Sequence, residues 1–210
     1  MSKKIVFGEV DWNTAQATNK PTNNNDLFLR LTEGENIVRV LGNPHQFYVH
    51  WVETSQGKRK INSPIESPAL VSRLEDSGFR RQTKWMIKVL DLSSQTFKVA
   101  EIGSQIYNGI IALVNNPRWG KVSAYDISII RGPKGTNPLY SVTPNPKEGI
   151  DPSLREKFKE WNAELDIERL VSPADPTKVC EVMGWDASSY TGDAPKEETV
   201  KDEDFDFDFE

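Results

Sequence analysis

The chain has 210 residues, of which 37% are hydrophobic and 27% are charged, and its formal net charge is −5. The length suits one domain with appendages, and no apolar run approaches a signal-peptide core or the roughly 20 residues of a membrane span, so we expect a soluble, intracellular protein. A single cysteine, Cys180, excludes an internal disulfide, and with only two histidines the chain lacks the ligands of a structural zinc site.

Four parts follow one another along the chain. Residues 1–25, rich in Asn, Thr, Gln and Ala, predict a flexible arm, and residues 26–147 carry the alternating apolar patterns of a folded domain. Residues 148–185 predict a helical extension packed on that domain. Residues 186–210 offer little to bury and predict a disordered linker that ends in an acidic, aromatic tail.

Short strands fill the first half of the domain. Apolar alternation predicts strands over residues 27–31, 37–41 and 46–53, and after a turn at residues 55–57 three adjacent cations, Lys58, Arg59 and Lys60, follow the last of them. Ser67 is a common N-cap residue and Pro68 is favoured at the first helical position, so a short helix is predicted to begin there and to end at Gly78.

The second half of the domain holds the longer elements. They are a hairpin of strands over residues 79–92 and 96–102, a helix that begins at Gly103 and ends at residues 115–117, a long strand over 122–131 and a last strand over 139–143. Beyond the domain, Leu154, Phe158, Trp161 and Leu165 share one face of a predicted helix that packs against the sheet from outside.

This order of elements predicts a mainly β fold with inserted helices. A central helix between the third and fourth main strands is the layout of the OB-fold, a five-stranded, partly open barrel that binds oligonucleotides. We therefore expect an OB-fold barrel over residues 26–147, with extra strands, a short helical insertion and a C-terminal helix.

Charged side chains are segregated along the chain. Residues 28–147 carry 16 basic and 9 acidic side chains, a net charge of +7, whereas residues 193–210 carry 2 and 9, a net charge of −7. A basic body joined to an acidic end indicates a polyanion ligand for the body and a tail that can imitate this ligand.

Single-stranded nucleic acid needs cations for its phosphates and aromatic rings for its bases, and such stacking contributes about 1–3 kcal/mol per base. The candidate cations are Lys58, Arg59, Lys60, Arg80, Arg81, Lys84, Lys88, Arg131 and Lys134. The candidate stacking residues are Tyr48, Trp51, Trp85, Tyr107, Trp119, Tyr125 and Tyr140. Trp85 and Tyr125 alternate with aliphatic residues, which favours the core for both, whereas Tyr48, Trp51 and Tyr140 suit either role.

The sequence offers little support for catalysis. His45 and His50 have no neighbouring nucleophile or carboxylate pair, and the loop at residues 132–135 lacks the Gly-Lys-Ser/Thr ending of a phosphate-binding loop. We therefore expect no enzymatic activity, no cofactor and no bound metal.

The tail consists of Asp202, Glu203, Asp204, Phe205, Asp206, Phe207, Asp208, Phe209 and Glu210. Acidic tails often serve only as solubilisers, but a solubiliser gains nothing from regularly spaced phenylalanines. A short peptide that docks into a basic groove with an apolar floor needs both carboxylates and aromatic rings. We expect this tail to bind protein.

Several stretches carry a resemblance to a known family through their order and spacing. They are residues 47–51 (FYVHW), 80–85 (RRQTKW), 97–107, 119–120 (WG), 125–127 (YDI) and 140–144 (YSVTP). Together they resemble the single-stranded-DNA-binding proteins of tailed bacteriophages, the T4-type helix-destabilising proteins and their shorter relatives. The resemblance covers roughly residues 27–146 and the acidic end.

This resemblance implies an OB-fold cleft lined by Arg80, Arg81 and Lys84. It also implies an acidic end that competes for the cleft and recruits replication and recombination proteins such as a polymerase, helicase or primase. The chain departs from the family in two places: residues 62–78 lack the zinc-binding Cys/His insertion of many relatives, and only Lys3 and Lys4 represent the basic arm that gives cooperativity. We expect the insertion to keep its helix and to pack without metal.

The sequence thus predicts a sequence-independent protein that coats and protects single-stranded DNA in phage replication, recombination and repair, in the cytoplasm of the infected bacterial host. Two alternatives stay open: an RNA-binding OB-fold protein, and an interaction adaptor of the replisome whose body is a scaffold. The sequence also leaves the oligomeric state open, with a dimer through tail exchange as one arrangement.

Overall fold

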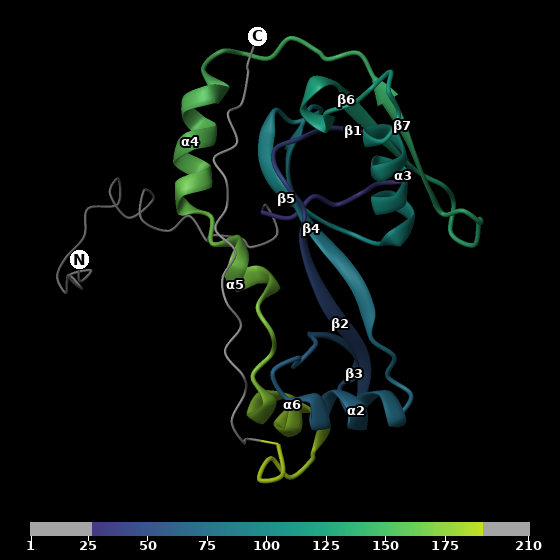
Figure 1. Ribbon diagram of the computed structural model, residues 1–210, viewed down its shortest axis with the longest axis vertical. Coiled ribbons are helices and arrows are strands. Elements are labelled where there is room, and N and C mark those ends of the chain that lie inside the picture. The colour runs from purple at the N-terminus through teal and green to yellow at the C-terminus, as the bar shows by residue number, and fades with distance from the viewer. Residues whose placement is uncertain (1–26, 191–210) are drawn as a thin grey trace, which may run out of the picture.

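The computed structural model describes residues 27–190, in which strands dominate the centre of the chain (Figure 1). The strands are β1 (Gly34–Val40), β2 (His45–Thr54), β3 (Gly57–Asn62), β4 (Gln82–Asp91), β5 (Thr96–Ile102), β6 (Asp126–Arg131) and β7 (Tyr140–Asn145). The helices are α2 (Pro68–Asp76), α3 (Ser104–Val114), the 3-10 turn η1 (Val122–Ala124), α4 (Leu154–Glu164), α5 (Ile167–Val171) and α6 (Pro176–Met183).

All seven strands belong to one antiparallel sheet in the order β3-β2-β4-β1-β6-β7, with β5 on the other edge of β4. The coarse prediction of a mainly β fold with helices is therefore confirmed. Strand β4 is the element that joins the sheet together. On one edge its first half pairs with β2, as in Gln46↔Trp85, and its last residues pair with β1, as in Val40↔Val89.

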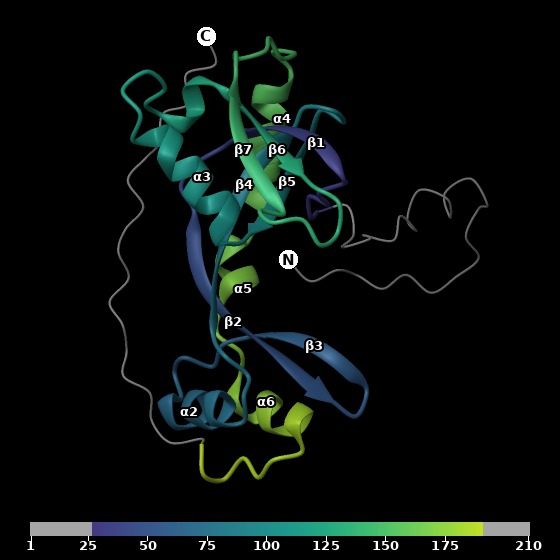
Figure 2. The same ribbon diagram turned by 90° about the vertical axis from the view of Figure 1, so that its right-hand side faces the viewer.

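This pairing divides the molecule into two parts (Figures 1 and 2). We call β1, β4, β5, β6, β7, α3 and α4 the body, and the outer half of β2 with β3, α2 and α6 the lobe. The long strands β2 and β4 run between them, with α5 beside them.

The main core of the body lies between the sheet and α3. Its buried residues are Val38, Val40, Trp85, Ile87, Val89, Ala100, Ile102, Ile106, Ile110, Tyr125, Ile127 and Ile129. Helix α3 can approach β7 closely because residue 109 is glycine: a Cβ atom there would lie 2.8 Å from the Val142 Cβ atom. The preference of Trp85 and Tyr125 for the core is confirmed, since both are buried.

Helices α4 and α5 cover the sheet away from α3. Leu154 and Phe158 of α4 pack against a buried cluster of β4 and its neighbours that includes Leu90, and Ile167 of α5 packs against Phe47. The helix predicted near Leu154 therefore packs against the sheet as expected. None of the helices between residues 27 and 190 has the length and apolar character that a membrane crossing requires.

A buried ion pair fastens the chain beyond β7 to the body. Arg39 donates from Nε to Asp126 Oδ1 at 2.7 Å and from Nη2 to Asp126 Oδ2 at 3.0 Å. Arg39 Nη2 also donates to the Glu148 carbonyl oxygen at 2.6 Å, and the Glu148 N–H donates to Asp126 Oδ2 at 2.7 Å. Because these groups satisfy one another, the two charges can be buried, whereas either one alone would be costly.

The lobe has a separate, smaller core. Val52, Leu70 and Leu74 of β2 and α2 pack against Val179 and Cys180 of α6, so α6 lies on the lobe. Burial raises the pKa of the Cys180 thiol above its ordinary value, which keeps this side chain neutral. The lobe thus packs through side chains that are about one hundred residues apart in sequence.

A buried histidine of β2 forms hydrogen bonds with both ends of the α2 insertion. His50 Nδ1 lies 2.6 Å from the Phe79 carbonyl oxygen, and its Nε2 lies 3.0 Å from Ser63 Oγ. Because a carbonyl oxygen can only accept, Nδ1 carries the proton of this bond. His50 therefore has a structural role that joins β2 to the ends of the α2 insertion.

The packed chain extends into residues that the sequence assigns to the linker. Residues 186–190 form a turn on α2, where the Arg73 guanidinium lies 4.3 Å from the Trp185 ring centroid. Arg73 Nη1 donates to the Tyr190 hydroxyl at 2.6 Å, and Ser67 Oγ donates to the Tyr190 carbonyl at 3.1 Å. Trp185 and Tyr190 supply the buried surface that this stretch otherwise lacks.

Two local predictions were wrong. Residues 27–31 form only an isolated bridge, Phe28↔Val99, which runs parallel to β5 and is held by two backbone hydrogen bonds. The strand predicted over 122–131 begins only at Asp126, because residues 122–124 form η1. In both places alternation of apolar residues was mistaken for a full strand.

Candidate nucleic-acid interface

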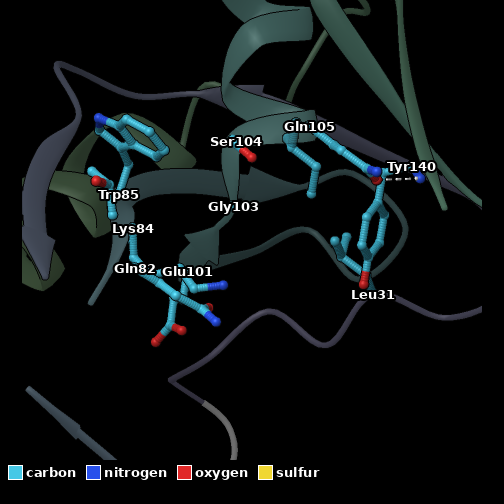
Figure 3. A pocket seen from close by; sticks show the side chains of 11 residues that line it. Leu31, Gln82, Lys84, Trp85, Glu101, Gly103, Ser104, Gln105 and Tyr140 are labelled. Carbon is cyan, nitrogen blue, oxygen red and sulfur yellow. Dashed lines mark hydrogen bonds between the residues drawn. The ribbon is translucent and has the colours of Figure 1, made fainter. Parts of the chain in front are cut away.

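A cavity of about 650 Å³ opens beside the end of β4 that pairs with β2 (Figure 3). The beginning of β4, the end of β5, the start of α3 and the start of β7 contribute its walls. The lining residues are Leu31, Gln82, Thr83, Lys84, Trp85, Glu101, Gly103, Ser104, Gln105, Ile106 and Tyr140. Four elements thus bring side chains from distant parts of the sequence to one place.

Lys84 lies beside the N-terminal end of α3. A Cβ atom on Gly103 would be 3.5 Å from Lys84 Nζ, and Gly103 is the N-cap residue of the helix. In the part of the chain that the structure describes, no side chain caps this terminus, and the adjoining Ser104 and Gln105 are exposed. The free N–H groups and partial positive charge of a helix N-terminus attract anions, and an ammonium group adds to that attraction. This end of the cavity has the chemistry that binds a phosphate.

Trp85 forms one wall of the cavity and is backed by Tyr107. The two rings stack with their centroids 3.8 Å apart and 3° between their planes. Trp85 is only 8% exposed, yet it lines the cavity, so it serves both the core and the wall. Tyr140 lies on the opposite side in Figure 3, where its backbone N–H donates to Gln105 Oε1 at 3.2 Å.

Glu101 is the acidic residue of the lining, and it is paired. Its carboxylate forms an ion pair and a hydrogen bond with Lys60 of β3. This contact places Lys60 at the edge of the cavity and links the lobe to the body. Because Lys60 neutralises the carboxylate, a phosphate near Lys84 meets less repulsion than an unpaired glutamate would cause.

The remaining predicted cations do not line this cavity. The Arg81 guanidinium lies 5.1 Å from the Tyr48 ring centroid, and its Nε is 3.6 Å from a Glu75 carboxylate oxygen. Arg131 supports the lining indirectly, since its Nη1 donates to the Leu31 carbonyl oxygen at 2.7 Å. Lys58, Arg59, Arg80 and Lys134 are exposed, and Lys88 is half-buried.

The other predicted aromatic residues are divided between the lobe and the far end of the body. Trp51 is 40% exposed and pairs with Lys60 in the register of β2 and β3, so a ring and a cation adjoin on the lobe. Trp119 packs edge-on against Tyr125 with the centroids 5.4 Å apart, and neither lines the cavity. Burial raises the pKa of the Tyr125 hydroxyl, which keeps that group neutral.

Sequence reasoning missed the uncharged polar part of the lining. Gln82, Thr83, Ser104 and Gln105 supply amide and hydroxyl groups that can donate and accept hydrogen bonds. Such residues are common on any surface, so composition gives no signal for them. Only the position of Gln82 and Thr83 between the arginine pair and Lys84 could have drawn attention to them.

The predicted arm and acidic tail lie outside the described residues. Within residues 27–190, no group of three or more His, Cys, Asp and Glu side chains is arranged to hold a metal ion. Comparison of the chain with protein-family models, with curated proteins and with solved structures found no match.

Proposed function

We propose that this protein binds single-stranded DNA without sequence preference, with the strand in the cavity beside β4 and β5. The observation that carries the proposal is the meeting of Lys84, Trp85 and Tyr140 at one cavity, because cations and stacking surfaces together are what unpaired strands require. The uncharged polar lining fits this role, since amides and hydroxyls can both donate and accept and so suit every base.

We further propose that the body is an OB-fold. The pairings β1 with β4, β4 with β5, β1 with β6 and β6 with β7 match five barrel strands in OB order, with α3 between the third and fourth. In this assignment β2, β3 and α2 are an insertion between the first two strands. OB-folds bind oligonucleotides on the face of their second and third strands, which here are β4 and β5. The cavity lies at that position.

The acidic tail completes the proposal. A peptide with six carboxylates, tethered to a basic body, competes with DNA at a high effective concentration, and it is free to recruit replication proteins once DNA displaces it. Removal of residues 202–210 should therefore tighten DNA binding and abolish recruitment. An unchanged affinity in the truncated protein would contradict the competition. The role in phage replication, recombination and repair rests on the resemblance in sequence.

Fluorescence titration with oligo-dT at several salt concentrations tests DNA binding. We expect quenching of tryptophan at low salt and a steep loss of affinity as salt rises, because phosphate contacts release counterions. Absence of quenching at low salt would refute the proposal. A parallel titration with oligo-rU measures the preference for DNA over RNA, and tighter binding of the RNA would favour the alternative of an RNA-binding protein.

A further inference from the structure

A second cavity, of about 280 Å³, lies behind the stacked ring pair. Tyr107 lines this cavity, whereas its partner Trp85 lines the first one, and no residue lines both. The lining residues are Val40, Gly42, Asn43, Pro44, Ile87, Ile102, Tyr107, Ile110, Ile111, Val114, Lys121, Val122 and Ser123. Most of them are apolar, so this cavity has little to offer a phosphate or a base edge.

Helix α3 gives the cavity its apolar wall. Tyr107, Ile111 and Val114 recur at helical spacing on one side of α3, while Ile106 on another side lies in the core. Val114, at the end of the helix, is 37% exposed. Helices α4, α5 and α6 cover other apolar surfaces of the sheet and lobe, but they do not contribute to this lining. Within residues 27–190, none of these helices covers the apolar wall, so it is accessible to a ligand.

The charge at this cavity limits the kind of ligand that can bind there. Lys121 is the one charged residue among those that line it, and it is exposed. A group that fills the cavity should therefore be apolar and should be flanked by negative charge. A nucleobase fits less well, because its polar edges would be buried against a largely apolar lining without hydrogen-bond partners. An aromatic side chain between carboxylates has this combination.

We propose that the apolar cavity binds a phenylalanine of the protein's own acidic tail. In an extended peptide Phe205, Phe207 and Phe209 would lie on one side and the intervening aspartates on the other. One ring can then enter the cavity against Tyr107 while a neighbouring carboxylate meets Lys121. Phe205 follows Tyr190 by 15 residues. An extended chain of that length spans about 50 Å, roughly three times the radius of gyration expected for a compact domain of this size.

This site is not the DNA cavity, for which the tail is proposed to compete with DNA. A ring docked against Tyr107 contacts the residue that stacks on Trp85, so the tail would be held next to the DNA cavity. The apolar cavity anchors the tail, and the carboxylates repel DNA. The docking itself does not depend on DNA binding, whereas its regulatory consequence rests on the proposed function.

Disulfide trapping in the full-length chain tests the docking. Val114→Cys is combined with Asp208→Cys, which leaves all three tail phenylalanines in place. Ile130→Cys with Asp208→Cys is the matched control, because Ile130 is also 37% exposed but does not line the cavity. The native Cys180 is fully buried and stays out of the reaction. Ser123→Cys, also on the lining, is the second test position.

We expect intrachain trapping at positions 114 and 123 to be roughly tenfold faster than at position 130, because docking raises the local concentration of the tail. Replacement of the three tail phenylalanines by alanine should remove the difference. Equal rates at all three positions would overturn the proposal. Faster trapping by Lys84→Cys than by Val114→Cys would also overturn it, by placing the tail in the DNA cavity. Neither result bears on the oligo-dT titration, so a failure of docking is distinguishable from a failure of DNA binding.

Discussion

The body and the lobe close their cores in different ways. The core of the body comes from strands β1, β4, β5 and β6 together with α3, most of which are neighbours in the sheet and in the sequence. The core of the lobe needs α6, which follows the lobe's own strands by more than one hundred residues. The long-range contact that completes the body is a backbone pairing of β1 with β6, whereas the lobe is completed by the side-chain packing of α6 from the C-terminal extension.

The body and the lobe also differ in the polar groups that they bury. The body buries a charged pair, Arg39 with Asp126, and the lobe buries a histidine, His50, between a carbonyl and a hydroxyl group. A buried charge that loses its partner is far more costly than a neutral group that loses a hydrogen bond. The loss of stability that a substitution causes should therefore differ between the two parts, both in its size and in how much of the molecule it affects.

The largest effect is expected for Asp126→Ala in the body. The substitution leaves Arg39 buried without its carboxylate and should lower the free energy of unfolding by about 3–5 kcal/mol. Denaturant unfolding measures the loss. His50→Ala in the lobe is the comparison, with an expected loss of about 1–3 kcal/mol. If both variants lost the same amount, the distinction between the two sets of buried polar groups would be wrong.

Leu74→Ala tests whether the lobe can open by itself. Leu74 is fully buried, and its truncation should remove about 2–5 kcal/mol from the packing of α2 against α6. Hydrogen exchange should then accelerate in β3, α2 and α6 and stay slow in the body. Leu90→Ala, at an equally buried position under α4, is the matched substitution in the body. Uniform acceleration by Leu74→Ala would show that body and lobe unfold as one unit.

A smaller, pH-dependent effect is expected at Asp91 in the body. Burial raises the pKa of this carboxyl, but hydrogen bonds from Ser93 and Ser94 outweigh it and leave the pKa below its ordinary value of 3.8. A lowered pKa stabilises the fold above the unfolded value, and the stabilisation is lost as the pH falls through the folded pKa. Asp91→Asn should cost about 1 kcal/mol at pH 7, and the difference should shrink below pH 3.8.

Thermal unfolding between pH 2.5 and pH 7 measures this dependence. Asp76→Asn, at the exposed end of α2, is the control, with an expected change of less than about 0.5 kcal/mol at every pH. A constant difference between Asp91→Asn and the parent protein across this range would exclude the carboxylate as its source.

The sequence predicted the elements of the body better than their assembly. Alternation located β4 and assigned Trp85 to the core, and the spacing of Ile106 and Ile110 located α3. These features are local, so short windows of sequence contain them. The same rule failed at residues 27–31, because one backbone bridge to β5 replaces the strand that alternation suggested.

The assembly of the site depended on contacts that no local pattern contains. The prediction named Lys84, Trp85 and Tyr140, which the fold brings to one cavity, but it also named Trp119, which does not line it. It did not anticipate that α6 would pack on the lobe, since amphipathic spacing shows that a helix has an apolar face and not what covers that face. The apolar cavity behind Tyr107 could not be predicted from the sequence either, because its lining comes from five separate segments.

The salt dependence of oligo-dT binding, with and without Lys84, tests the proposed DNA cavity most directly. For the parent protein, the logarithm of the binding constant should fall linearly with the logarithm of the salt concentration. Lys84→Ala should weaken binding about tenfold and reduce the slope by about 0.7, the value for one phosphate contact on a single strand. Lys159→Ala, on the exposed side of α4, should change neither. Equal slopes and affinities for the Lys84 and Lys159 variants would contradict the account.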